Sequence, residues 1–246
     1  MNDELKFTVI SDIHYYSKKN FVDGFDKNKK PKPGQLFFSR SEEIVEHTFD
    51  CLCKNDTPDI VLISGDLTYN GERTSHDEMK AALKKLQQKG KRVYVITATH
   101  DYTTPRMPTY GIDKNDKYIE VESVKRTQLL KYYGDFGYNN AIAKHKSTMS
   151  YVAQLADGYR LFALNDDYGD PDCGFSDELM NWVKTEANNA KRDGQYIIAM
   201  THHPLVPPSP IYAAVAKGDM LSEYELRRKQ LSDLGFDFVL TGHTHM

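Results

Sequence analysis

The C-terminal segment of the chain carries two histidines one residue apart, His243 and His245, just after an apolar run that ends at Leu240. In an extended segment, residues i and i+2 face the same side, so both imidazoles can aim at one place beyond a strand end. Imidazole is a common ligand of transition metals. A His-x-His pair alone is a weak signal, so a metal site here requires further ligands from elsewhere in the chain.

Four upstream stretches also place metal-ligand residue types directly after an apolar run. They are Asp12 with His14, Asp66, Thr99 with His100, and His202 with His203. Ligands of α/β sheets bind at the carboxyl ends of the strands, so all five stretches can converge. The set holds carboxylates and imidazoles but no thiolate, which suits Mn, Fe, Zn or Co. Any single member could be a turn or loop residue, and the coincidence of five favours a metal site.

The elements that must position these residues are strands alternating with helices. Apolar runs predict strands over 5–11, 59–64, 92–97, 195–201 and 236–240. Helical periodicity predicts helices over 39–54, 75–90, 123–133, 176–192 and 222–235. The turn Asp157-Gly158 predicts one antiparallel hairpin between 148–155 and 159–165. This order predicts an α/β fold with a mixed sheet or two sheets.

Serine residues are expected to begin four of these helices. Ser39, Ser75 and Ser222 each precede a glutamate by three residues, which is the pattern of a capping box, and Ser176 is expected to cap the fourth helix. In the first helix the inward residues are expected to be Ile44, Val45, Thr48, Phe49 and Leu52.

Composition limits the classes of function. The 246 residues are 39% hydrophobic, enough for a sizeable core in one α/β domain. The net charge of −3 gives no overall field that favours nucleic acid or an anionic membrane. No apolar run approaches the roughly 18 residues of a membrane span, and the acidic start argues against a signal peptide. Cys51, Cys53 and Cys173 are expected to be reduced thiols of a cytoplasmic protein.

Taken together, the five stretches resemble the calcineurin-like metallophosphoesterases. Their pattern is Asp-x-His, Gly-Asp, Gly-Asn-His-Asp/Glu, His and Gly-His-x-His. Here it reads Asp12-Ile13-His14, Gly65-Asp66, Ala98-Thr99-His100-Asp101, His202 and Gly242-His243-Thr244-His245. The segment 65–72 looks like bacterial members, including relatives of the cyclic-nucleotide phosphodiesterases. The resemblance implies a four-layer αββα sandwich with two mixed sheets. It also implies a single domain over 1–246, truncated at its C-terminal end because family members continue beyond this block.

The resemblance implies two divalent transition-metal ions, Mn, Fe or Zn, and assigns their ligands. One ion would be held by Asp12, His14, Asp66 and His245, and the second by Asp66, Thr99, His202 and His243. Asp66 would bridge, since a shared carboxylate partly neutralises two cations about 3.5–4 Å apart. His100 would protonate the leaving oxygen or bind phosphate, with Asp101 orienting its imidazole. His203, Tyr69 and Asn70 are candidate substrate-binding residues.

The third block departs from the family. Thr99 stands where the family has an asparagine ligand, so the second metal site is expected to be weaker or completed by water. Ala98 stands where the family has glycine, and its methyl group is expected to hinder the usual turn.

The expected function is a dinuclear phosphoesterase that hydrolyses a phosphate mono- or diester by attack of a metal-bridging hydroxide. One alternative is a catalytically weakened, phosphoesterase-like binding or scaffold protein, suggested by Thr99. Another is a mononuclear metal-binding domain, which would leave His100 and His202 without a role. The expected partner is a small phosphorylated substrate such as a nucleotide, with no stable nucleic-acid complex and no membrane.

Overall fold

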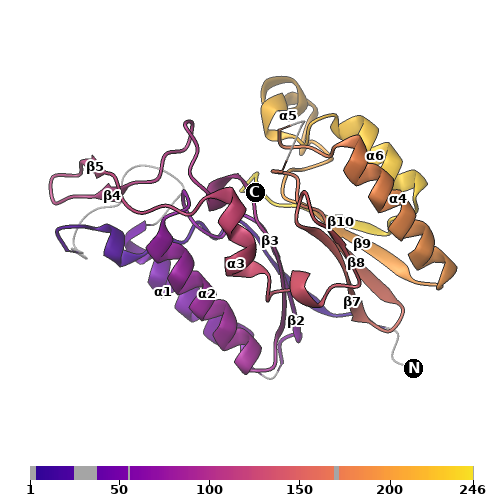
Figure 1. Cartoon of the computed structure of the whole chain (residues 1–246), viewed down its shortest axis with the longest axis horizontal. Coiled ribbons are helices and arrows are strands. Elements are labelled where there is room, and N and C mark those ends of the chain that lie inside the picture. Colours follow the sequence, from indigo (N-terminus) through magenta and orange to yellow (C-terminus); the bar gives the residue numbers. More distant parts are fainter. Residues whose placement is uncertain (1–3, 25–37, 55, 169–171, 246) are drawn as a thin grey trace.

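The computed structural model describes residues 4–24, 38–54, 56–168 and 172–245, and its strands form two main sheets (Figure 1). The first sheet has the order β1-β2-β3 and is parallel throughout. The second has the order β10-β9-β8-β7-β6, with β8, β9 and β10 parallel and β6 and β7 antiparallel. A small sheet, β4-β5, lies apart. The bounds are β1 Phe7–Ile10, β2 Ile60–Ser64, β3 Arg92–Ile96, β4 Gly111–Ile112, β5 Tyr118–Ile119, β6 Ala143–His145, β7 Ser150–Ala156, β8 Tyr159–Ala163, β9 Tyr196–Met200 and β10 Phe238–Leu240.

Helices cover the outer face of each sheet. Figure 1 shows α1 and α2 outside the first sheet and α4 and α6 outside the second. The bounds are α1 Ser41–Leu52, α2 Arg73–Gln88, α3 Leu129–Tyr133, α4 Asp177–Arg192, α5 Pro210–Val215 and α6 Tyr224–Asp233. None of these helices of the described chain is both long and apolar enough to cross a membrane.

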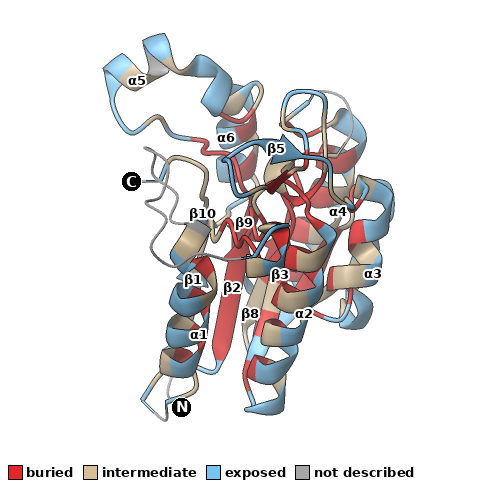
Figure 2. Ribbon diagram, turned by 90° about the vertical axis from the view of Figure 1, so that its left-hand side faces the viewer, coloured by how far each residue is buried: buried red, intermediate tan, exposed pale blue. Residues whose placement is uncertain are grey.

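Three apolar cores hold the four layers together. In one, α1 and α2 pack on the first sheet through residues such as Phe49, Met79 and Val61. The second lies between the two sheets, and the third between α4 and the second sheet. Because β2 has helices on one face and the second sheet on the other, all five of its residues are buried (Figure 2). This arrangement is the predicted αββα sandwich.

The predicted hairpin and helices are present, but most of the predicted caps are wrong. Ser176 caps α4 as expected, its side chain accepting from the Leu179 N–H. The three other helices begin elsewhere, with Arg40, Glu72 and Glu223 at the N-cap and no side-chain cap bond. In α2 this happens because the hydroxyl of Ser75 instead accepts from the Ser17 backbone and the Asn20 side chain.

Two smaller expectations concern the inward face of α1 and the state of the cysteines. Ile44 was expected to face inward, but it is 47% exposed, since α1 turns Val45, Phe49 and Leu52 to the core instead. The three cysteines are free, as expected.

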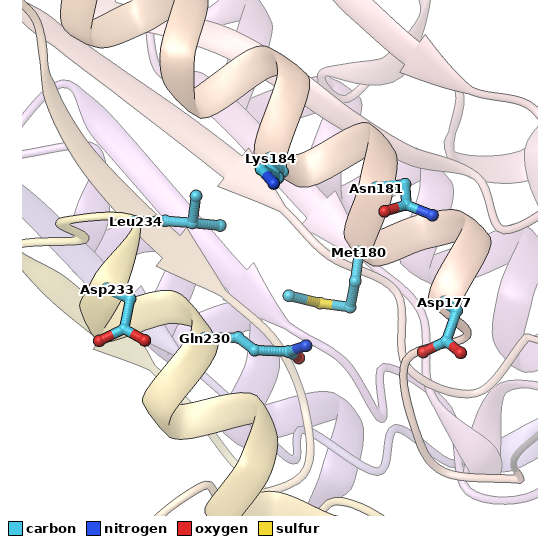
Figure 3. Close-up of a pocket in the computed structure, with 7 residues that line it drawn as sticks. All are labelled: Asp177, Met180, Asn181, Lys184, Gln230, Asp233 and Leu234. Atoms are coloured by element: carbon cyan, nitrogen blue, oxygen red, sulfur yellow. The ribbon is translucent and has the colours of Figure 1, made fainter.

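A groove runs between α4 and α6 on the outer side of the second sheet (Figure 3). Its lining residues are Asp177, Met180, Asn181, Lys184, Gln230, Asp233 and Leu234. None of them belongs to the predicted metal site.

Candidate metal centre

The parallel strands bring the predicted ligands to one place. Their side chains form three groups, and in each group one ligand atom per residue lies within 4.8 Å of the others. The groups are Asp12, His14 and His245; His14, Asp66 and His100; and Asp66, His202 and His243. The first sheet contributes Asp12, His14, Asp66 and His100, and the second sheet contributes His202, His243 and His245. The predicted convergence at the strand ends is therefore what the fold produces.

The backbone at five of the predicted ligands is strained. Asp12, His14, Asp66, His243 and His245 all have φ between 45° and 73°. Non-glycine residues rarely adopt this left-handed region, and such strain gathers at functional sites, where surrounding contacts enforce it. Here the Asp12 carboxylate holds the His243 N–H at 2.9 Å, and the His14 N–H donates to the Asp66 carbonyl at 2.9 Å.

Two glycines allow the strand ends to approach each other. Gly65 has φ +96°, and a Cβ there would lie 2.8 Å from Nδ1 of His202. A Cβ at Gly242 would lie 2.7 Å from Oδ2 of Asp12. Both positions therefore need glycine, because Ala98 and His202 at Gly65, and Ser11 and Asp12 at Gly242, occupy the space of a side chain.

His202 has the environment of a metal ligand. It is fully buried, and its Nδ1 lies 2.8 Å from the Ser64 carbonyl, so that nitrogen carries the hydrogen. Its Nε2 faces Oδ2 of Asp66 at 3.1 Å and Nδ1 of His243 at 3.3 Å. These donor atoms converge on one point, which suits either a proton on Nε2 or a metal cation in its place. A histidine that donates its other N–H to a backbone carbonyl is typical of metal ligands.

The side of the centre next to β1 has the same character. Nε2 of His14 lies 3.1 Å from Nε2 of His245 and 3.7 Å from Oδ2 of Asp66. Nε2 of His245 lies 3.3 Å from Oδ1 of Asp12. Two imidazole nitrogens and two carboxylates thus surround one point, and this donor set fits a divalent transition metal.

The protonation states suit these roles. Burial lowers the pKa of His14 and that of His243 to about 4 each, so both rings are neutral at pH 7 and offer a lone pair. Burial also lowers the pKa of His202, but the Asp66 carboxylate outweighs burial and raises that pKa to about 9. The space between His202 and Asp66 therefore attracts positive charge.

A sequence comparison identifies the family. The family description of the calcineurin-like phosphoesterases matches residues 5–246. The chain belongs to the calcineurin-like phosphoesterases. It is accordingly a metal-dependent phosphoric ester hydrolase. Membership of this family implies that the chain uses divalent metal ions. No curated protein sequence matches the chain.

Solved structures support the fold of this phosphoesterase. A dimetal phosphatase from Danio rerio is similar with a TM-score of 0.64 and 12% identity, over 97% of this chain and 81% of that one. A purple acid phosphatase from yellow lupin seeds is similar with a TM-score of 0.59 and 15% identity, over 97% of this chain and 37% of that one. At these identities the likeness concerns the fold.

The third block of the phosphoesterase motif differs from expectation at Ala98. This residue has φ −145° and ψ −169°, which is extended backbone open to any residue. The expectation that its methyl group hinders the turn is therefore wrong. Thr99 begins the short 3-10 turn Thr99–Asp101, and the next N–H, that of His100, donates to Oδ1 of Asp66 at 3.0 Å.

The carboxylate of Asp101 does not contact the imidazole of His100. Its two oxygens accept from the backbone N–H groups of Thr68 and Ala98, each at 2.9 Å, and so fix the loops after β2 and β3. Nδ1 of His100 lies instead 2.5 Å from the Tyr69 carbonyl and 2.9 Å from Oδ1 of Asn70.

The candidate substrate-binding residues lie beside the centre. The rings of Tyr69 and His100 are 6.1 Å apart between centroids, and those of His203 and His243 are 4.4 Å apart. Asn70 is buried and contacts His100 as described. Tyr69 is half-buried, and its hydroxyl lies 3.0 Å from that of Tyr110.

One important residue, Asp166, was missed by the sequence analysis. It is fully buried after β8, and its Oδ2 accepts from the Thr201 hydroxyl at 2.7 Å and from the N–H groups of His202 and His203 at 3.1 and 2.7 Å. Its Oδ1 lies 3.2 Å from Nδ1 of His203. Burial lowers the pKa of His203, but Asp166 outweighs burial and holds it well above its usual value. Asp166 also follows an apolar strand, but that strand is marked in the sequence only as half of a hairpin, not as a neighbour of the His202 strand.

Proposed function

We propose that this chain is a dinuclear phosphoesterase that hydrolyses a small phosphate mono- or diester with two divalent transition-metal ions, Mn, Fe or Zn. Asp12, His14, Asp66 and His245 would hold one ion, and Asp66, His202 and His243 the other, with Thr99 at the remaining position. When bound, such a pair of cations activates a water molecule and neutralises the charge of the phosphate.

The position of Asp66 carries this proposal. Its Oδ2 lies 3.1 Å from Nε2 of His202 and 3.7 Å from Nε2 of His14, so one carboxylate faces ligands of both proposed ions. The carboxylate is buried, and its Oδ1 accepts the His100 N–H, which fixes its orientation. A mononuclear site would need neither the second group of imidazoles nor a carboxylate between the two groups.

His100 is the proposed general acid. Its Nδ1 faces two acceptors, so Nε2 is the ring nitrogen available to a substrate. The His100 ring meets that of His14 edge to face, with centroids 4.7 Å apart, which places it over the centre. With a second proton on Nε2, the ring can donate that proton to the leaving oxygen or a hydrogen bond to the phosphate.

His203 and Tyr69 favour a small anionic substrate such as a nucleotide. Asp166 keeps the His203 ring in place beside His243, where it can bind a phosphate oxygen. The half-buried ring of Tyr69, near His100, offers a face to a base or a sugar.

The decisive experiment measures metal content together with turnover. The chain is loaded with Mn²⁺, Fe²⁺ or Zn²⁺, the bound metal is counted by mass spectrometry, and hydrolysis of p-nitrophenyl phosphate and of bis-p-nitrophenyl phosphate is followed. We expect two ions per chain and turnover of at least one ester. Two ions without turnover would support the binding-protein alternative, and one ion without turnover the mononuclear one. His47→Ala, which removes an exposed histidine of α1, is the matched control.

A further inference from the structure

The imidazole of His100 is held by the segment that follows β2. Its Nδ1 lies 2.5 Å from the carbonyl oxygen of Tyr69 and 2.9 Å from Oδ1 of Asn70. Both partners are acceptors, so Nδ1 carries a hydrogen and donates to them. The orientation of His100 therefore depends on what fixes the peptide group between Tyr69 and Asn70.

The buried carboxylate of Glu72 accepts a hydrogen bond from the N–H of that peptide group. The N–H of Asn70 donates to Oε1 of Glu72 at 3.0 Å. The Tyr69 carbonyl and the Asn70 N–H belong to one planar trans peptide unit and point in opposite directions. A continuous chain of hydrogen bonds thus runs from the Glu72 carboxylate, through one peptide group, to the imidazole of His100.

Glu72 itself is fixed in place. It is completely buried at the N-cap of α2, and its carbonyl accepts the His76 N–H at 3.0 Å. On one side of it, the Gly71 carbonyl accepts the Val124 N–H at 2.8 Å. On the other, the Arg73 N–H donates to the Glu122 carbonyl at 2.9 Å. Gly71 has φ +75°, and a Cβ there would lie 2.6 Å from Cα of Tyr102, so the backbone of this segment packs closely against that of Tyr102.

We propose that Glu72 is a positioning residue for His100, acting through the Tyr69–Asn70 peptide group. The carboxylate oxygen fixes the plane of that peptide and, because hydrogen bonds in a chain polarise one another, strengthens the Tyr69 carbonyl as an acceptor. Glu72 thereby does for His100 what Asp101 was expected to do. The catalytic consequence rests on the proposed function of His100, whereas the orientation of the ring does not.

The protonation of Glu72 does not decide this role. Burial raises the pKa of Glu72 to about 7. Its Oε1 can accept the Asn70 N–H whether or not Oε2 carries a proton, so the geometry persists in both forms.

Three variants test the proposal. Glu72→Met removes the acceptor at similar volume, Glu72→Gln keeps a carbonyl acceptor at the same position, and Glu78→Gln is the control on the same helix. We expect Glu72→Met to lower kcat by about 10- to 100-fold, the range for residues that orient a catalytic group, with KM and metal content unchanged. The loss should be smaller for esters with a good leaving group, and Glu72→Gln should restore most of the rate.

A second measurement does not depend on activity. The ¹⁵N shifts of the His100 ring, assigned by comparison with His100→Ala, report which nitrogen carries the hydrogen. In the parent, in Glu72→Gln and in Glu78→Gln we expect Nδ1 to carry a hydrogen, whether or not Nε2 is also protonated. In Glu72→Met we expect a mixture of rings protonated at Nδ1 and rings protonated at Nε2. Glu72→Ala replaces the Met variant if the latter does not fold.

The two measurements separate failure of this proposal from failure of the proposed function. A folded acceptor-free variant with the parent's ¹⁵N shifts and the parent's kcat would overturn the role of Glu72. If the parent binds metal but hydrolyses no ester, the general-acid role of His100 fails, and the ¹⁵N comparison alone decides whether Glu72 positions the ring.

Discussion

The two sides of the metal centre are held in very different ways. His202 is fully buried, donates to the Ser64 carbonyl, and sits on a turn whose N–H groups are bound by Asp166. His245 is exposed, and within the described chain its ring has only His14 and Asp12 as polar partners. Its strand, β10, also precedes His243 and, among the described strands, pairs with β9 alone. The proposed site with Thr99 in place of asparagine thus contains the best-fixed candidate ligand, His202.

In the proposed dinuclear centre, this difference would compensate for threonine at position 99. A ligand that is already oriented by surrounding hydrogen bonds loses little conformational freedom when it binds a metal, so a fixed site can bind with fewer ligands. The proposed site of His14 and His245 has all the ligands that the family resemblance implies, but fewer hydrogen bonds hold these ligands in place. Nδ1 of His14 is buried and has no hydrogen-bond partner among the described residues.

Replacing Asp66, which is assigned to both proposed ions, should have the largest effect on metal content and activity. Asp66→Asn takes away the only charge assigned to both ions, so we expect metal to be lost from both sites. Activity should fall by more than the roughly 100-fold typical of changes that only orient a ligand. Metal content by mass spectrometry and turnover of a phosphodiester provide the check. Near-normal occupancy of two metals in this variant would rule out the bridging role.

His100 faces the centre but is not assigned as a metal ligand. Its replacement should therefore lower the rate of hydrolysis without changing the metal content. We expect His100→Ala to keep both metals and to lower kcat by roughly 10²- to 10⁴-fold, the range for a general acid. Esters whose leaving group has a low pKa need no proton and should lose less. An equal loss across a series of leaving groups would show that His100 positions the phosphate instead.

Asp166 supports one side of the centre and not the other, and its loss should weaken that side alone. In Asp166→Ala the hydroxyl of Thr201 and the N–H groups of His202 and His203 lose their acceptor. Each buried donor left unpaired costs about 1–3 kcal/mol of folding stability. We expect the metal at His202 to bind about 10- to 100-fold more weakly, as for other residues that orient ligands.

A milder substitution at the same position serves as the control. Asp166→Asn keeps an oxygen that can accept from all three groups, so metal affinity by calorimetry should stay close to that of the parent. If Asp166→Ala weakened both metals equally, the two sides would not be independent.

The sequence predicts that the candidate ligands converge, because each follows an apolar strand and parallel strands bring their carboxyl ends together. Asp166 was missed for a physical reason. The Asp157-Gly158 turn marks β8 as half of a hairpin, but only its pairing with β9 makes it a parallel neighbour of the His202 strand. Sequence spacing contains no information on that pairing.

The predictions that failed depended on hydrogen bonds between distant segments. Ser75 was expected to cap α2, but Ser17 and Asn20 use its hydroxyl. Asp101 was expected to face its neighbour His100, but its carboxylate joins the loops after β2 and β3. In both cases a local pattern competed with partners that only the folded chain supplies.

The smallest expected effect comes from restoring the family's ligand at Thr99. Asparagine reaches one atom further than threonine and presents a carbonyl oxygen, a better neutral ligand than a hydroxyl on a β-branched side chain. Because His202 and His243 are already fixed, we expect Thr99→Asn to tighten the second metal by no more than about tenfold, or about 1.4 kcal/mol. Ala98→Gly should add nothing, since Ala98 is extended and its methyl packs against Gly65. The measurement is activity against added Mn²⁺ for the parent, Thr99→Asn and the double variant. Superimposed curves for the parent and Thr99→Asn would show that Thr99 lies away from the second metal.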